Sequence, residues 1–150
     1  MVQKRAFSLV ELIVVVVCIG ILAAIVVPRL NFAAISKHKA EATARKITID
    51  LRRTRRLAVS NAATNTEGFK LKMSGSVPYT GYEIENEDTG ETVDTHTIDS
   101  AVSCTGDSDF RFGPLGNLTD DDTQLTVSAE GKTFAITIIP ATGMIKCSEN

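Results

Sequence analysis

The sequence predicts an α+β fold in which one long N-terminal helix packs on a small antiparallel β-sheet head. An almost uncharged apolar run fills residues 7–30, a stripe of small and apolar side chains at helical spacing runs through residues 31–63, and polar and apolar residues alternate over residues 64–150. Together with a short polar leader at residues 1–6, these patterns give the expected organisation: leader, membrane half of the helix, amphipathic half and β-rich head.

The apolar run Phe7–Leu30 is long enough to cross a bilayer. Up to Pro28 it would reach roughly 33 Å as a helix, and it carries a single charge, Glu11. A carboxylate inside such a run costs roughly 2.5–3.5 kcal/mol on insertion, so we expect Glu11 to have a partner or a function. Lys4 and Arg5 precede the run, which favours a cytoplasmic N-terminus and places the rest of the chain across the membrane.

The amphipathic half is expected to continue the same helix. Residues 31–63 contain no proline and no glycine, so a helix from Phe7 to Ala63 would be roughly 85 Å long, interrupted only at Gly20 and Pro28. We expect it to end in the stretch Asn61–Gly68, which is rich in poor helix formers. Its buried stripe is predicted to consist of Ala40, Ala44, Ile47, Leu51, Thr54, Ala58 and Ala62.

Short antiparallel strands are expected beyond this helix, because the apolar period changes to two residues and turn residues bound each run. The amphipathic helix is needed to cover their apolar face. The runs are Phe69–Met73, Tyr82–Glu85, Leu125–Val127 and Phe134–Ile138, with Met144–Cys147 as a candidate edge strand.

Residues 4–12 resemble a known processing signal. Lys4, Arg5 and Ala6, followed by Phe-Ser-Leu-Val-Glu-Leu at Phe7–Leu12, look like the cleavage and methylation motif of type IV prepilins and type II secretion pseudopilins, with Glu11 at the fifth mature position. These leaders usually end in glycine, and here the residue is Ala6, whose small side chain is expected to retain cleavage.

Two further stretches are similar to the GspH/FimT-type minor pseudopilins. Asp50–Leu71 looks like the helix end and first strand of that subfamily, and the tail resembles it at Phe112–Gly116 and Thr142–Ile145. Pro28 also stands where the wider family commonly carries a helix-interrupting proline.

The resemblance implies a structural filament subunit of a type II secretion pseudopilus or type IV pilus. Prepilin peptidase would cleave between Ala6 and Phe7 and methylate the new Phe7 amine, which would pair with Glu11, between neighbouring subunits, in the filament core. The segment from Gly20 to Pro28 would melt on assembly. The implied partners are other pilins or pseudopilins and the inner-membrane assembly platform, and the implied location is the bacterial inner membrane, then the filament, with the head outside the cytoplasm.

Two alternatives stay open. A minor pilin that binds DNA or a surface would use the basic cluster Arg52, Arg53, Arg55 and Arg56, although the net charge of −2 argues against nucleic acid and favours a solvated or intersubunit face. A periplasmic domain released by signal peptidase would instead lose the whole apolar run.

Candidate sites of other kinds are weak. Cys104 and Cys147 are a candidate disulfide pair if the head lies outside the cytoplasm, and the sequence leaves that pairing open. No cofactor and no metal site are expected, because the histidines, cysteines and aspartates lack ligand spacing. His96 and the residues near it form only a chance Ser/His/Asp set, and without a nucleophile elbow or phosphate loop we expect no enzyme.

Overall fold

The computed structural model describes residues 8–26 and 32–150. The chain divides near Phe32 into an N-terminal unit and a head, which are described separately. In the N-terminal unit, α1 spans Leu9–Val26 and includes Gly20 in regular helix. The predicted leader, Phe7 and Pro28 lie outside the described residues. Within residues 8–26 and 32–150, no helix has the length and apolar character needed to cross a membrane.

The amphipathic helix of the head is α2, Phe32–Ser60. Its predicted stripe is confirmed from Ala40 to Ala58, where each of the six named side chains is completely buried. Ala62 is exposed, so its place in the stripe was wrong. The reason is that the helix ends at Ser60 and the chain turns. In this turn the Asn61 carbonyl accepts hydrogen bonds from the N–H groups of Thr64 and Asn65.

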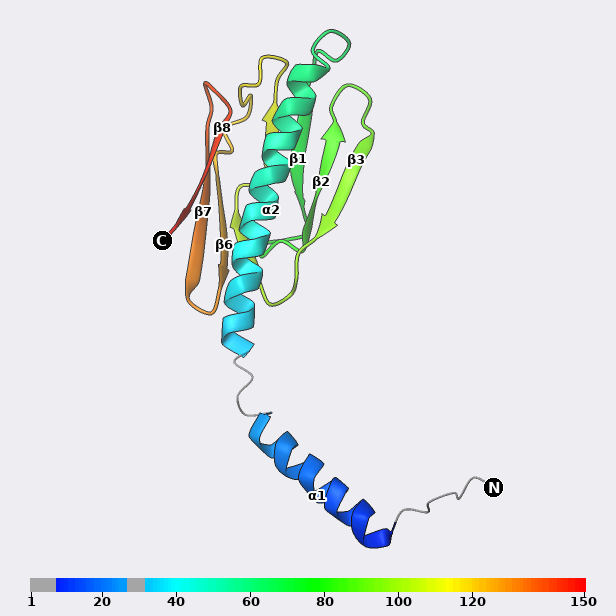
Figure 1. The fold of residues 1–150 in the computed structure, drawn as a ribbon. Helices are drawn as coiled ribbons and strands as arrows, with labels where there is room; N and C mark the ends of the chain where they lie inside the picture. Colours follow the sequence, from blue (N-terminus) through cyan, green and yellow to red (C-terminus); the bar gives the residue numbers. More distant parts are fainter. Residues whose placement is uncertain (1–7, 27–31) are drawn as a thin grey trace, which may run out of the picture. The chain divides into compact units, whose positions relative to one another are not determined.

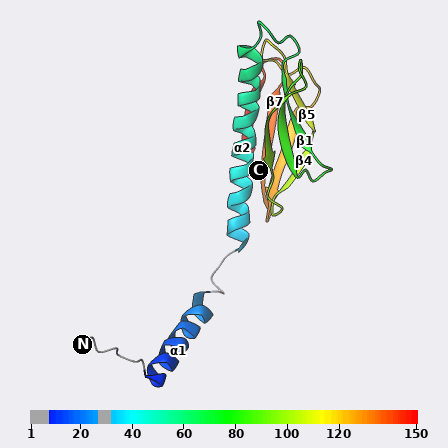
Figure 2. The same ribbon diagram turned by 90° about the vertical axis from the view of Figure 1, so that its right-hand side faces the viewer.

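Two antiparallel four-stranded sheets form the rest of the head, where the sequence suggested one small sheet. One has the order β3-β2-β1-β5 and the other β4-β6-β7-β8, and α2 lies along one side of both (Figures 1 and 2). The strands are β1 Phe69–Ser74, β2 Gly81–Asn86, β3 Thr92–Thr97, β4 Ser103–Gly106, β5 Asp109–Phe112, β6 Gln124–Ala129, β7 Lys132–Ile139 and β8 Met144–Glu149.

The core lies between α2 and the apolar faces of the sheets. Side chains alternate along the strands as the two-residue period requires, so that Leu71, Ile84 and Phe110 are buried while their neighbours along the chain face outward. The core includes Ile47, Leu51, Tyr82, Phe112, Leu125, Val127, Ile136 and Ile138.

The five predicted runs all fall on strands, and Met144–Cys147 lies in β8, an edge strand as expected. Three strands, β3, β4 and β5, were missed. Most of β3 is exposed, so it has no apolar alternation to read, while β4 and β5 have only four residues each.

Acidic residues join the two sheets at the β4–β5 turn. Asp107 Oδ2 accepts the N–H groups of Thr123 and Gln124, and Asp122 Oδ2 accepts those of Ser108 and Asp109. These carboxylates therefore accept backbone N–H groups that the strand pairing leaves without a partner. Within residues 8–26 and 32–150, no cluster of three or more candidate metal ligands occurs.

The packing of α2 predicts unequal effects at two neighbouring helix positions. Leu51 is completely buried, whereas Ile49 is 60% exposed. Leu51→Ala should lower the free energy of unfolding by about 2–5 kcal/mol, because it removes buried apolar surface and leaves a cavity. Ile49→Ala is the matched control and should change it by less than about 1 kcal/mol. Urea titration of both variants checks this, and equal losses would contradict the observed orientation of α2.

An ion-pair ladder on the outer face of the first sheet predicts a pH dependence. Lys70 Nζ lies 2.9 Å from Glu85 and 2.7 Å from Glu87, and its hydrogen bond lowers the pKa of the Glu85 carboxyl. A carboxyl with a lower pKa in the folded state contributes stability above its unfolded pKa of about 4.3, and this contribution is lost as the pH falls through the folded pKa.

We therefore expect Lys70→Met to be less stable than the parent at neutral pH, with the difference shrinking below about pH 4. Urea midpoints across that range measure it. Lys72→Met is the control, because Lys72 Nζ is 4.0 Å from Glu85 and more exposed. A difference between Lys70→Met and the parent that stays constant from neutral to acid pH would count against the ion pair as its cause.

Candidate functional site

Apart from Glu11, the side chains of α1 are apolar on all sides of the helix, and those of residues 9–24 are exposed. Leu9 is 73% exposed, and Val16 and Leu22 are each about three-fifths exposed. A helix that is apolar all round is normally buried in a larger assembly or in lipid.

Glu11 is the one charged residue in α1 and lies in its first turn. The side chain is exposed, and no described residue forms an ion pair or hydrogen bond with it. A carboxylate in the first turn interacts favourably with the helix dipole, which is worth typically about 0.3–1 kcal/mol. Glu11 therefore suits the helix but lacks a partner among the described residues. Phe7, its predicted partner, is outside them.

The four clustered arginines near the end of α2 do not form one free basic surface. Arg53 Nη1 lies 2.6 Å from Asp94 Oδ2 on β3, Arg52 Nη2 donates to the Ile145 carbonyl on β8, and Arg55 Nε donates to the Gly116 carbonyl at 2.9 Å. Arg56 is exposed. The structure thus separates the residues that the sequence grouped and engages three of them within the head.

A polar cluster that sequence reasoning missed joins α2 to β2 and β3. Asp50 on α2 is buried and accepts a 2.6 Å hydrogen bond from the Tyr82 hydroxyl, and Lys46 Nζ lies 3.6 Å from the same carboxylate. Burial and then the Asp50 hydrogen bond raise the pKa of Tyr82, so the hydroxyl stays protonated as a donor. The sequence signal that could have indicated this cluster is Asp50, because a carboxylate directly before Leu51, a residue of the buried stripe, needs a polar partner when the helix packs.

His96 completes this cluster. Its Nε2 atom lies 3.5 Å from Asp50 and 3.4 Å from Asp94 but is aligned with neither for a hydrogen bond, and its ring packs on Tyr82 with centroids 5.1 Å apart. Hydrogen bonding by Arg53 lowers the pKa of Asp94. The cluster therefore joins α2 to β2 and β3 through charged and hydrogen-bonded side chains, and its hydroxyl, that of Tyr82, donates to Asp50.

The candidate disulfide is not formed. Cys104 and Cys147 are both free thiols, on β4 and β8 at opposite edges of the second sheet. With β6 and β7 between them, three strand spacings separate their backbones by about 14 Å, well beyond the reach of a disulfide. Burial raises the pKa of the Cys104 thiol to about 12, so it packs as an apolar side chain.

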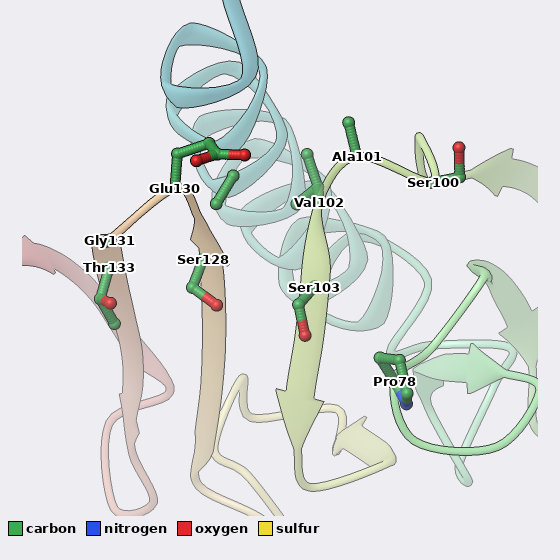
Figure 3. A pocket seen from close by; sticks show the side chains of 10 residues that line it. Pro78, Ser100, Ala101, Val102, Ser103, Ser128, Glu130, Gly131 and Thr133 are labelled. Carbon is green, nitrogen blue, oxygen red and sulfur yellow. The ribbon is translucent and has the colours of Figure 1, made fainter. Parts of the chain in front are cut away.

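A surface hollow of about 430 Å³ lies at the β4 end of the second sheet (Figure 3). Hydroxyl groups of Ser100, Ser103, Ser128 and Thr133 line it, together with the carboxylate of Glu130. Its ten lining residues include no histidine, cysteine or basic side chain, so Glu130 is the one ionisable group among them.

Comparison with known proteins identifies one feature, at the N-terminus. Residues 1–27 match the family model described as the prokaryotic N-terminal methylation motif. No curated protein and no solved structure matches the chain. The chain therefore carries a prepilin-type methylation motif, followed by a helix packed on antiparallel sheets, an architecture consistent with a pilin-like fold.

The buried cluster predicts that two tyrosine hydroxyls contribute unequally to the free energy of unfolding. Tyr82 donates to the Asp50 carboxylate, whereas the Tyr79 hydroxyl donates to the neutral carbonyl of Gly106 at 2.9 Å. Tyr82→Phe should lower the free energy of unfolding by about 1.5–3 kcal/mol and Tyr79→Phe by about 0.5–1.5 kcal/mol. Chemical denaturation of both variants tests this, and a loss at Tyr79 that matched or exceeded that at Tyr82 would refute the assignment.

Proposed function

We propose that this protein is a minor pseudopilin or pilin, a structural subunit of a type II secretion pseudopilus or type IV pilus. The supporting observation is the combination of the methylation motif with α1, an apolar helix whose one carboxylate is unpaired within the described chain. Such a helix needs surroundings supplied by lipid or by other subunits. The motif implies a membrane-anchored precursor that prepilin peptidase processes before assembly.

Processing would create the partner that Glu11 lacks. Cleavage between Ala6 and Phe7 would leave a positively charged amine on Phe7, four residues before Glu11 in the chain. An ion pair between that amine and a Glu11 carboxylate, in the filament core, would offset the cost of two separate charges in apolar surroundings. Because a misplaced subunit would leave both charges unpaired, the pair would also set the register of assembly.

The segment between Gly20 and Pro28 has a further proposed role in assembly. Gly20 lowers helix propensity, and beyond its own stretch of helix no atom of the described residues lies within 4 Å of the position that a Cβ would take. Pro28 would remove one helical hydrogen bond. We propose that this segment unwinds in the filament while it is helical in the free subunit up to Val26.

We propose that the subunit belongs with the GspH/FimT-type minor pseudopilins, on the resemblance at Asp50–Leu71 and in the tail at Phe112–Gly116 and Thr142–Ile145. The assembly platform and other pilins are its proposed partners, with the head outside the cytoplasm. DNA binding is not proposed, because Arg52, Arg53 and Arg55 are engaged within the head.

Replacement of Glu11 tests the assembly role. We expect Glu11→Ala to be cleaved and methylated normally but to be absent from sheared filaments, because the Phe7 amine would have no carboxylate partner. Mass spectrometry of the membrane fraction measures processing, and immunoblotting of the sheared fraction measures incorporation.

The control is Glu91→Ala, which removes an exposed carboxylate from the head. It should enter filaments as the parent does. Incorporation of Glu11→Ala at the parental level would exclude the proposed ion pair. A mature N-terminus near Ile25, in place of methylated Phe7, would instead support a domain released by signal peptidase.

A further inference from the structure

The edge of β8 is open, and the hydrogen-bond pattern shows which groups it presents. Asn150 N–H donates to the Thr133 carbonyl, and the pairing register places Lys146 opposite Thr137 and Ser148 opposite Ala135. Hydrogen-bonded pairs alternate along an antiparallel ladder, so Lys146 and Ser148 bond β7. The N–H and C=O groups of Ile145, Cys147 and Glu149 therefore point away from β7, toward the open side.

The other three sheet edges are protected. On β4, the Tyr79 N–H and hydroxyl donate to the outward carbonyls of Cys104 and Gly106. On β5, Thr119 N–H donates to the Arg111 carbonyl. On β3, the side chain of Asp94 accepts the N–H of the next residue, and a bulge interrupts the pairing with β2. Loops, side chains and bulges are the usual means of preventing edge-to-edge pairing.

The β8 edge has much less protection. Arg52 Nη2 donates to the Ile145 carbonyl, and no described residue bonds the outward groups of Cys147 or Glu149. Beside this edge, a groove of about 440 Å³ runs between α2 and β8, with Ile49 on the helix side and Phe134 on its sheet side. Exposed apolar side chains flank both faces of β8: Ile49 is 60% exposed on one, and Met144 is 52% exposed on the other.

We propose that a second copy of this chain docks on this edge, with the two β8 strands antiparallel about a twofold axis at Cys147. In this register Ile145 lies opposite Glu149 of the second copy, and all outward N–H and C=O groups of both strands are paired. The Arg52 hydrogen bond can persist, because a carbonyl oxygen accepts two hydrogen bonds. The proposal rests on the head alone and stands apart from the filament role.

The sequence of β8 suits pairing with itself. About the axis at Cys147, Lys146 lies opposite Ser148 of the second copy and Glu149 lies opposite Ile145, so no like charges face each other. The axis is perpendicular to the joined sheet, so both α2 grooves lie on the same face. The exposed Ile49 and Met144 side chains of each copy then gain neighbours from the other.

Thiol cross-linking of the full-length protein in detergent tests the contact. In a Cys18→Ser background, Cys147 is the reactive thiol, since Cys104 is buried. A short bismaleimide should give a covalent dimer that Cys147→Ser abolishes. The collision control places the thiol on β3, as Thr95→Cys with Cys147→Ser, because Thr95 is exposed on a distant edge strand. Equal yields from the two positions would overturn the proposal.

Charge variants on the outer face of β8 test the register itself. Ser148→Lys would face Lys146 of the second copy and should reduce the dimer yield, whereas Ser148→Glu at the same exposed site should increase it. Combining Lys146→Glu with Ser148→Lys should restore the yield. Equal yields from Ser148→Lys and Ser148→Glu would overturn the proposed pairing.

A backbone variant separates strand pairing from side-chain contact. Glu149→Pro removes an outward N–H and leaves the β7–β8 ladder intact, since proline is tolerated where an edge N–H faces away from the sheet. It should lose most of the dimer that Glu149→Ala retains, and both lose the ion pair with Lys132. Thermal unfolding of the two variants confirms an intact head, and equal dimer yields would overturn the proposal.

Discussion

One contact supports the whole head: the packing of α2 against the apolar faces of both sheets. Each sheet has one apolar face, which cannot be left in water, and a single helix covers both. Small side chains make this geometry feasible, because Ala40, Ala44 and Ala58 let the strands approach the helix backbone closely. Thr54 is also buried there, and its hydroxyl donates a hydrogen bond to the Asp50 carbonyl, so it adds no unpaired polar group.

Polar contacts then fix the rotation of α2 about its axis. Asp50 and Arg53 reach β2 and β3 on one side, while Arg52 and Arg55 reach β8 and the Gly116 loop on the other. Apolar packing alone is not directional, whereas these bonds are satisfied in one orientation only. The arginines that read as a basic surface in the sequence therefore serve mainly to hold the helix in place.

The sequence predicted those parts of the fold that repeat locally. The α2 stripe and the strands with buried alternate residues follow from periods of 3.6 and two, which a short window contains in full. The sequence did not predict β3, because most of its side chains are exposed. It also did not predict the hydrogen bond between Asp50 and Tyr82, because these residues are 32 positions apart in the chain. The candidate disulfide between Cys104 and Cys147 was wrong because it, too, depended on residues far apart in the chain. The order β4-β6-β7-β8 separates the cysteines, and strand order is not a local property.

The head and the N-terminal unit differ in how far their apolar and polar groups are buried or paired. In the head, apolar faces, buried carboxylates and three of the four sheet edges find partners within the chain. In α1, the apolar side chains of residues 9–24 are exposed, and Glu11 has no ion-pair partner among the described residues. An exposed helix that is apolar on all sides is normally covered by lipid or by other subunits. The methylation motif covers residues 1–27, which include this whole helix. The motif that implies filament assembly therefore coincides with the helix whose apolar side chains are exposed.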